Sequence, residues 1–210
     1  YTMTNKGKFV VIDGGDGTGK SSVVAYLQEK LLNAPVLFTR EPGGTPFAEQ
    51  IRALLLQERE EHVFSEAELM LFSASRIQHV GNVVIPALKK GKHAISDRFS
   101  LSTIAYQLYG NGRLDLVKFF ETLDVVAVSG CTPDLYVLLD VETEVALARR
   151  IKAGGLTRFD KKDVEFHKAV RLGFLQHLSR YPYSVVIDTS KSEEEVKQEV
   201  LKTVKDFLNL

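Results

Sequence analysis

Residues 14–21 of the chain read Gly14-Gly15-Asp16-Gly17-Thr18-Gly19-Lys20-Ser21. This stretch matches the pattern GxxxxGK(S/T) in full, and it stands between a short apolar run and a helix-length segment. Glycines let the backbone wrap closely around phosphate oxygens, and the N-terminus of the following helix adds a favourable dipole. We expect Lys20 to contact the β- and γ-phosphates and Ser21 to hold Mg²⁺. The stretch therefore predicts a nucleoside triphosphate site at the end of a buried strand.

Five short apolar runs, the first of them directly before this loop, alternate with long amphipathic segments. The runs cover residues 9–12, 36–38, 94–96, 135–139 and 185–187. Helices are predicted at roughly 20–32, 45–57, 65–90, 100–109, 113–128, 142–153, 163–180 and 192–208. Continuous apolar runs are typical of parallel strands covered on both faces, and strand–helix alternation is typical of a doubly wound sheet. The pattern predicts an α/β fold in one domain, residues 1–210, with a five-stranded parallel sheet flanked by helices on both faces.

The composition is that of an ordinary globular chain, and it excludes several classes of protein. Of the 210 residues 44% are hydrophobic, and 27 Lys and Arg balance 27 Asp and Glu, so no nucleic acid partner is expected. The single cysteine, Cys131, allows no internal disulfide framework and no cysteine-based zinc site. No apolar run approaches the roughly 18–20 residues that span a bilayer, and residues 1–8 lack an apolar signal core. We therefore expect a cytoplasmic protein without a membrane partner.

The phosphate-loop pattern alone is shared by GTPases, ATPases and small-molecule kinases. A GTPase would need an NKxD sequence to bind guanine, and Asn5-Lys6-Gly7-Lys8 fails this pattern and precedes the first strand. The one DxxG sequence runs from Asp16 to Gly19 and so lies inside the loop itself. The sequence therefore disfavours a GTPase.

A second set of phosphate-binding groups follows the second and third predicted strands. Arg40 comes at the end of one strand, and Asp97-Arg98 comes at the end of the next. Doubly wound folds bind ligands at the carboxyl ends of their strands, where Asp97 suits a metal shell and Arg98 a bidentate phosphate contact. Each arginine alone could equally be a surface residue in an ion pair. Two of them beside a phosphate loop indicate two nucleotides and phosphoryl transfer between them.

The predicted helix 65–90 carries an arginine on its apolar stripe. Phe72 and Arg76 are one turn apart on that face, where an arginine is costly unless a partner satisfies it. A base ring stacked on Phe72 and bonded to Arg76 would supply that partner. A carboxylate reached by a snorkelling arginine would do so equally well.

The segment after Arg98 has a polar face. Ser102 lies one turn from Tyr106, and Thr103 lies one turn from Gln107. These side chains could read a base edge and a sugar. Alone, they are also compatible with an ordinary capped surface helix.

In their order along the chain, these residues resemble the thymidylate kinase family, whose members phosphorylate dTMP with ATP. The resemblance runs from Phe9 to about Phe207. It rests on residues 14–21, Phe38-Thr39-Arg40-Glu41-Pro42-Gly43-Gly44-Thr45, Phe72 with Arg76, Asp97-Arg98-Phe99, Ser102-Thr103-Ile104-Ala105-Tyr106-Gln107, Pro133-Asp134-Leu135 and Leu139-Asp140-Val141. The resemblance implies the P-loop nucleoside monophosphate kinase fold, Mg²⁺ as cofactor, ATP and dTMP as ligands, and a homodimer packed through helix 65–90.

The resemblance also assigns residues to the two substrates. For ATP it implies Gly14, Gly15, Asp16, Gly17, Thr18, Gly19, Lys20, Ser21, Ser22 and Arg149, with residues 188–191 across the adenine from Arg149. For dTMP it implies Asp16, Phe38, Arg40, Phe72, Arg76, Arg98, Ser102, Thr103, Tyr106 and Gln107. For the metal it implies Ser21 and Asp97. Within the dTMP set, Asp16 is expected to hold the sugar 3′-hydroxyl, Arg40 and Arg98 the phosphate, and Phe72 and Arg76 the thymine.

The resemblance further implies a mobile lid at about residues 150–164 that brings arginine to the transferring phosphoryl group. One form of the family has an arginine inside the phosphate loop, where this chain has Gly17, so the chain resembles the bacterial form with lid arginines. Two positions that often carry arginine in that form are Ala153 and Ala169 here. The catalytic charges are then expected to be those of Lys20, Arg98, Arg158 and Arg150.

Two other interpretations stay open. The chain could be another nucleoside monophosphate kinase on the same fold, which the choice of acceptor would reveal. It could also be a relative that binds both nucleotides without turnover, an idea motivated by Ala153 and Ala169. Such a relative would form no ADP.

Overall fold

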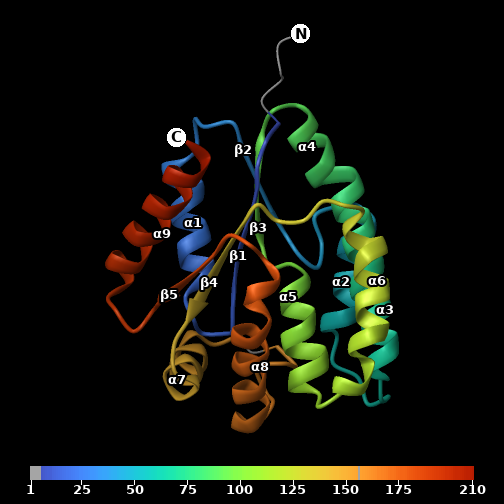
Figure 1. The fold of residues 1–210 in the computed structure, drawn as a ribbon. Coiled ribbons are helices and arrows are strands. Elements are labelled where there is room, and N and C mark those ends of the chain that lie inside the picture. Colours follow the sequence, from blue (N-terminus) through green and yellow to red (C-terminus); the bar gives the residue numbers. More distant parts are fainter. Residues whose placement is uncertain (1–5, 156) are drawn as a thin grey trace.

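The sheet is built as the apolar runs predict. The computed structural model describes residues 6–155 and 157–210, so the polar start at residues 1–5 and Leu156 of the predicted lid lie outside the described part. Five strands form the sheet: β1 (Phe9–Gly14), β2 (Val36–Arg40), β3 (His93–Asp97), β4 (Leu135–Asp140) and β5 (Ser184–Asp188). Their order is β2-β3-β1-β4-β5, and every neighbouring pair is parallel (Figure 1). The predicted five-stranded parallel sheet is confirmed.

The sheet has an apolar core on each face, because successive residues of a strand point to opposite sides. In β1, Phe9 and Val11 belong to one core, and Val10 and Ile12 belong to the other. The first core is covered by α3 (Ser65–His79), α6 (Val117–Val128) and α8 (Val164–His177). The second is covered by α1 (Lys20–Lys30) and α9 (Glu193–Leu208). Helices therefore flank both faces, as the continuous apolar runs predict.

Four further helices join these layers. They are α2 (Pro46–Leu56), α4 (Ile85–Lys89), α5 (Ser100–Thr103) and α7 (Thr143–Ala153). Within residues 6–155 and 157–210, no helix combines the length and the apolar character needed to cross a membrane.

Two predicted helices contain wider, π-helical turns. Segment 65–90 divides into α3, a π helix over Val80–Val84 and α4. Pro86 follows that π helix; its ring crowds the carbonyl four residues earlier, and it has no backbone N–H to donate. Segment 100–109 divides into α5 and a π helix over Ile104–Gly110, which lines the ligand cavity described below. Functional sites are a frequent setting for such turns.

The carboxyl ends of the strands gather the residues that the sequence singles out. β1 ends at Gly14, where the phosphate loop begins, and α1 begins at Lys20 directly after the loop. β2 ends at Arg40 and β3 at Asp97, and the strand register pairs these two residues. The first strand, β1, lies between β3 and β4, so the loop sits where the strand order reverses direction. Open α/β sheets bind their ligands at this point.

Candidate active site

The phosphate loop is held in shape by its glycines and by Lys20. Gly14, Gly17 and Gly19 have φ values of 146°, 82° and 91°, in the region that favours glycine. A Cβ atom on Gly17 would lie 1.9 Å from the carbonyl oxygen of Ala146, so no side chain fits there without rearrangement. Nζ of Lys20 is buried and donates to the carbonyl oxygens of Gly14 and Gly15, each at 2.9 Å.

The surroundings of Lys20 favour the binding of an anion next to its ammonium group. Burial lowers the pKa of Lys20, and the nearby charge of Arg98 lowers it further, against the opposing effect of three carboxylates. A phosphate bound in the loop would offset that burial, because an opposite charge favours the protonated amine. The lysine therefore gains most from a ligand with high negative charge.

A large cavity, here called the donor cavity, opens around the loop. It brings together most of the residues expected at ATP and the metal, namely Asp16, Gly17, Thr18, Gly19, Lys20, Ser21, Ser22, Asp97 and Arg149. On its far side Arg149 donates to the carbonyl oxygen of Thr189 at 2.9 Å, so α7 and the segment after β5 meet there. Ser22 Oγ bonds to Glu193 at the start of α9.

The donor set beside Lys20 fits Mg²⁺. One carboxylate oxygen of Asp97, Oδ1, is buried and accepts no hydrogen bond from the part of the chain that the structure describes. Ser21 lines the same cavity with its hydroxyl. Across the described ranges, no three His, Cys, Asp or Glu side chains cluster as a ready metal site. One carboxylate with a hydroxyl, completed by phosphates and water, is the arrangement that Mg²⁺ adopts with nucleotides.

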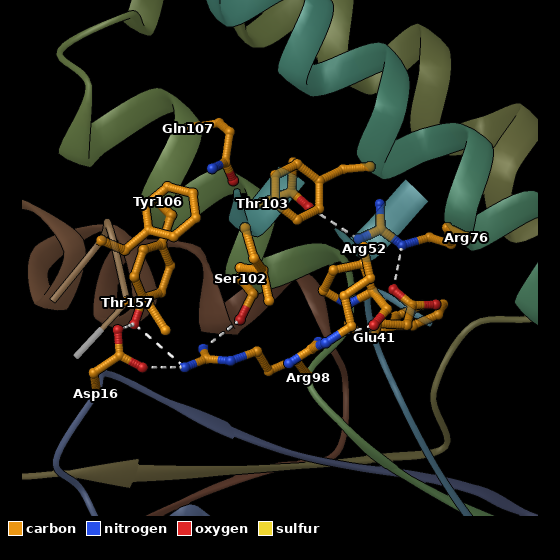
Figure 2. A pocket seen from close by; sticks show the side chains of 15 residues that line it. Asp16, Glu41, Arg52, Arg76, Arg98, Ser102, Thr103, Tyr106, Gln107 and Thr157 are labelled. Atoms are coloured by element: carbon orange, nitrogen blue, oxygen red, sulfur yellow. Dashed lines mark hydrogen bonds and ion pairs between the residues drawn. The ribbon is translucent and has the colours of Figure 1, made fainter. Parts of the chain in front are cut away.

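A second cavity, the acceptor cavity, lies between the phosphate loop, α3 and the α5–π-helix segment (Figure 2). Eight of the residues expected at dTMP line it, namely Asp16, Phe72, Arg76, Arg98, Ser102, Thr103, Tyr106 and Gln107. Asp16, Arg52, Arg98 and Thr157 line both cavities, so the two meet at these residues. The amide nitrogen of Gln107 is buried without a bonding partner in the described structure, as a group reserved for a ligand would be.

Arg98 occupies the junction of the two cavities. Its backbone has a φ of 71°, which is unusual for an arginine and points to a position fixed by its surroundings. The guanidinium donates to Asp16 Oδ1 at 2.6 Å, to Ser102 Oγ at 2.9 Å and to the Gly14 carbonyl at 3.1 Å. Tyr106 also donates to Asp16, through its hydroxyl at 2.7 Å. Burial alone would raise the pKa of Asp16, but Arg98 and Lys20 lower it, so Asp16 is held as a carboxylate.

Arg76 has a carboxylate partner and still faces the acceptor cavity. Its Nε donates to Glu41 at 2.8 Å, and a terminal nitrogen donates to Thr103 Oγ1 at 2.9 Å. A third donor reaches Asp124 at 3.4 Å. These contacts compensate the burial of the charge. Because a guanidinium has five N–H groups, donors remain for a ligand. Arg76 can therefore have a carboxylate partner and bind a base as well, so the two interpretations of its position in the sequence are compatible.

Two residues expected at dTMP lie elsewhere. Phe38 packs against the core under α1 and α9, because it is in register with Ile95, which belongs to that core. The assignment of Phe38 to the acceptor site thus has no support from its position. Arg40 lies at the strand end as expected, but its side chain is exposed and donates to Glu49 at 2.9 Å.

The two predicted lid arginines are engaged within the protein. Arg150 lines the donor cavity and donates to both carboxylate oxygens of Asp160, at 2.8 and 3.0 Å. Arg158 lines neither the donor nor the acceptor cavity. It donates to the Leu55 carbonyl at 2.7 Å and to Glu68 at 2.6 Å. Of these two lid arginines, Arg150 is therefore the one that lines the cavity around the phosphate loop.

Sequence reasoning missed Arg52 and Thr157. Arg52, on α2, is half-buried and donates to the Pro42 carbonyl at 2.9 Å. Burial lowers the pKa of Arg52, and the positive charge of neighbouring Arg40 lowers it further. An anion bound there would stabilise the charged form of Arg52. The signal was present, because Arg52 lies four residues after the buried Ala48 and three before the buried Leu55, and so shares a helix face with both. For Thr157 no pattern in the sequence singles out the hydroxyl.

Known proteins resemble this chain along nearly its whole length. The family model described as "Thymidylate kinase" matches residues 12–200. A thymidylate kinase of Carboxydothermus hydrogenoformans is 44% identical over 198 residues, which covers 93% of this chain and 95% of the relative. One from Pelotomaculum thermopropionicum is 40% identical over 208 residues, with 97% and 95% covered. The crystal structure of thymidylate kinase from Ehrlichia chaffeensis superposes with a TM-score of 0.72 at 31% identity, covering 95% of this chain and 99% of that one. A phosphate loop that opens onto two adjoining cavities, and this similarity from end to end, lead to one conclusion: the chain belongs to the thymidylate kinase family.

Proposed function

We propose that this protein transfers the γ-phosphoryl group of ATP to dTMP, giving ADP and dTDP. The observation that carries the proposal is the meeting of the two cavities at Asp16 and Arg98. One cavity ends on a phosphate loop, and the other is lined by an aromatic ring, buried donors and arginines. This arrangement holds two nucleotides with their phosphates face to face.

In the acceptor cavity, we assign the dTMP phosphate to Arg98 and Arg52. Arg40, which does not line the cavity, would have to leave Glu49 to join them. Phe72 offers a ring for thymine to stack on. Arg76 offers N–H donors to the thymine O4. The remaining polar groups complete the nucleoside site, with Ser102, Thr103 and Gln107 at the base edge and Asp16 and Tyr106 at the sugar.

In the donor cavity, we assign the ATP phosphates to the backbone N–H groups of the loop and to Lys20. Ser21 and Asp97 would hold Mg²⁺, which neutralises charge on the phosphates when bound. The acceptor is itself a phosphate anion, so no general base is required. This chain contributes by aligning the two phosphates and by surrounding the transferring group with positive charge from Lys20 and Arg98.

We propose the lid-arginine form of the family for this chain. An arginine at position 17 is incompatible with the observed loop, because a Cβ there meets the backbone of Ala146. Residues 150–164 would then act as the lid, with Arg158 and Arg150 as its charges. Closure requires Arg158 to leave Glu68 and the Leu55 carbonyl, which the binding of both nucleotides can drive.

The choice of acceptor tests the proposed reaction. We expect rapid ADP release when dTMP is the acceptor, and no rapid ADP release with UMP, CMP or AMP. CMP carries an amino group where thymine has O4, so it would face the donors of Arg76. We expect dUMP, which lacks one methyl group, to be slower by about 10- to 200-fold in kcat/KM. A preference for another monophosphate would make the chain a different nucleotide kinase. Binding of ATP and dTMP without any ADP would make it a relative without turnover.

A homodimer packed through α3 is part of the proposal. Met70 and Ile77 on α3 are 51% and 44% exposed, and Val125 and Val126 on α6 are 72% and 64% exposed. The two helices lie side by side (Figure 1). We propose that a second copy of the chain covers these exposed apolar side chains. We expect light scattering at micromolar concentration to give the dimer mass, and Val126→Glu to give a monomer. Leu172→Glu on α8 is the control and should stay dimeric. A monomeric wild type would contradict this assembly.

The remaining assignments follow from the substrates. ATP and dTMP are soluble nucleotides of the cytoplasm, and we place the enzyme there. Residues 1–210 would form one kinase domain. No nucleic acid or membrane is part of the proposed reaction.

A further inference from the structure

One buried carboxylate beside the site has no role in the reaction described so far. Asp13 is the last residue but one of β1, and its side chain is fully buried. A buried charge is costly unless it is paired and hydrogen-bonded. Asp13 must therefore be held by specific partners.

Four donors meet this carboxylate. Oδ1 accepts from Ser102 Oγ at 2.7 Å, from the Gly14 amide at 2.9 Å and from Arg98 at 3.4 Å. Oδ2 accepts from the hydroxyl of Tyr136, on the neighbouring strand β4, at 2.6 Å. The carboxylate thus joins two strands to the start of the phosphate loop and to two residues of the acceptor cavity.

The residue that Asp13 holds in place, Gly14, is shared by both halves of the site. The N–H of Gly14 donates to Asp13, and the carbonyl of the same residue, in the next peptide group, accepts from both Lys20 at 2.9 Å and Arg98 at 3.1 Å. A shift of Asp13 would therefore move two groups that accept from Arg98, namely the Asp13 carboxylate and the Gly14 carbonyl. Ser102, which bonds to both Asp13 and Arg98, would move with them.

We infer that Asp13 and Tyr136 form a positioning pair that sets the direction of the Arg98 guanidinium toward the acceptor phosphate. The inference rests on the proposed assignment of that phosphate to Arg98. When the dTMP sugar binds to Asp16, Arg98 loses its shortest hydrogen bond to a carboxylate. Asp13 is then the buried anion that still faces Arg98. Tyr136 holds the second oxygen of Asp13 and so fixes the rotation of the carboxylate.

Removing one oxygen atom tests the pair. Tyr136→Phe keeps the ring, which stacks on Tyr181 with centroids 4.4 Å apart, and deletes only the hydroxyl on Asp13. We expect kcat/KM for dTMP to fall about tenfold, as the loss of a hydrogen bond to a charged group predicts. KM for ATP should stay within about twofold, because the loop glycines and Lys20 are unchanged. Tyr181→Phe is the matched control, since its hydroxyl is not among the four donors on Asp13, and should behave as wild type.

The pH profile separates positioning from a structural role. Burial raises the pKa of Asp13, and Arg98, Tyr136 and Lys20 oppose that rise. Tyr181 also faces this region, behind Tyr136. Losing the Tyr136 hydroxyl removes one opposing effect, so the pKa of Asp13 rises further. The acid limb of kcat/KM for dTMP should therefore move to higher pH in Tyr136→Phe and stay in place in Tyr181→Phe. A general loss of stability would lower activity at every pH alike.

Arg98→Ala and Asp13→Asn complete the experiment. If Arg98→Ala leaves KM for dTMP unchanged, the assignment of the acceptor phosphate is wrong. If Arg98→Ala raises that KM but Tyr136→Phe matches Tyr181→Phe in rate and pH profile, the positioning pair alone is wrong. Asp13→Asn should lose about 100-fold in kcat/KM for dTMP. If Asp13→Asn does not fold, the comparison of Tyr136→Phe with Tyr181→Phe still tests the positioning pair.

Discussion

Lys20→Met is expected to lower kcat by about 10³-fold or more while the fold persists. The ammonium group is the buried positive charge of the phosphate loop, and it lies between the Gly14 and Gly15 carbonyls. Methionine is of similar length and suits the buried position, but it offers no charge to the β- and γ-phosphates as negative charge spreads in the transition state. ADP release at saturating dTMP measures the loss, and a thermal melt followed by circular dichroism checks the fold.

Lys30→Met is the matched control for this variant. Lys30 lies in the last turn of the same helix, is exposed, and pairs with the neighbouring Glu29. Exposed pairs contribute little, so this variant should turn over and melt as wild type does. A folded Lys20→Met enzyme with near-normal turnover would remove the role assigned to the phosphate loop.

Arg158→Ala is expected to lower kcat on the order of 10³-fold, the effect of an arginine inserted at a transferring phosphoryl group. KM for dTMP should stay nearly unchanged, because Arg98 and Arg52 hold the acceptor phosphate independently. Arg150→Ala should lose less, since Arg150 is held by Asp160 and by the Gly154 and Gly155 carbonyls. Steady-state kinetics of the single variants measures both effects.

The contacts of Arg158 provide a competing outcome and a control. In the structure it ties the lid to α2 and α3 through the Leu55 carbonyl and Glu68. If that is its whole role, Arg158→Ala will melt at lower temperature and keep its kcat. Glu68→Gln weakens the contact from the other side and should hold kcat at or above wild type. A dead Arg150→Ala beside an active Arg158→Ala would assign the lid charge to α7 instead.

Much of this architecture could be predicted because its signals are local. The glycine pattern of residues 14–21 needs no tertiary partner to be recognised, and continuous apolar runs mark strands that are covered on both faces. The same continuity hides which face each side chain takes, so the sequence could not show that Phe38 packs against the core under α1 and α9. A π-helical turn changes the helical period only locally, so the apolar stripe of segment 65–90 does not reveal it.

The misses at the site have a different origin. Arg52 resembles Arg76 in lying on a helix face with buried apolar residues, but it belongs to none of the motifs on which the family resemblance rests. Arg158 could be placed in the lid from its flanking residues. Its partners Leu55 and Glu68 lie 103 and 90 residues away in the chain, so their contacts come only from tertiary structure.

The ion pair between Arg98 and Asp16 makes acceptor binding an exchange of partners. In the structure each of these two charged groups is the partner of the other, at 2.6 Å. As assigned above, the dTMP phosphate takes the place of Asp16 at Arg98, and the sugar hydroxyl takes the place of Arg98 at Asp16. Each charge would then have a partner both before and after dTMP binds, so binding would leave no buried charge unpaired. A nucleoside without a phosphate would break the pair and bring no anion to replace Asp16, so of its two carboxylate contacts Arg98 would keep only the longer one, with Asp13 at 3.4 Å. The ion pair therefore disfavours the binding of thymidine.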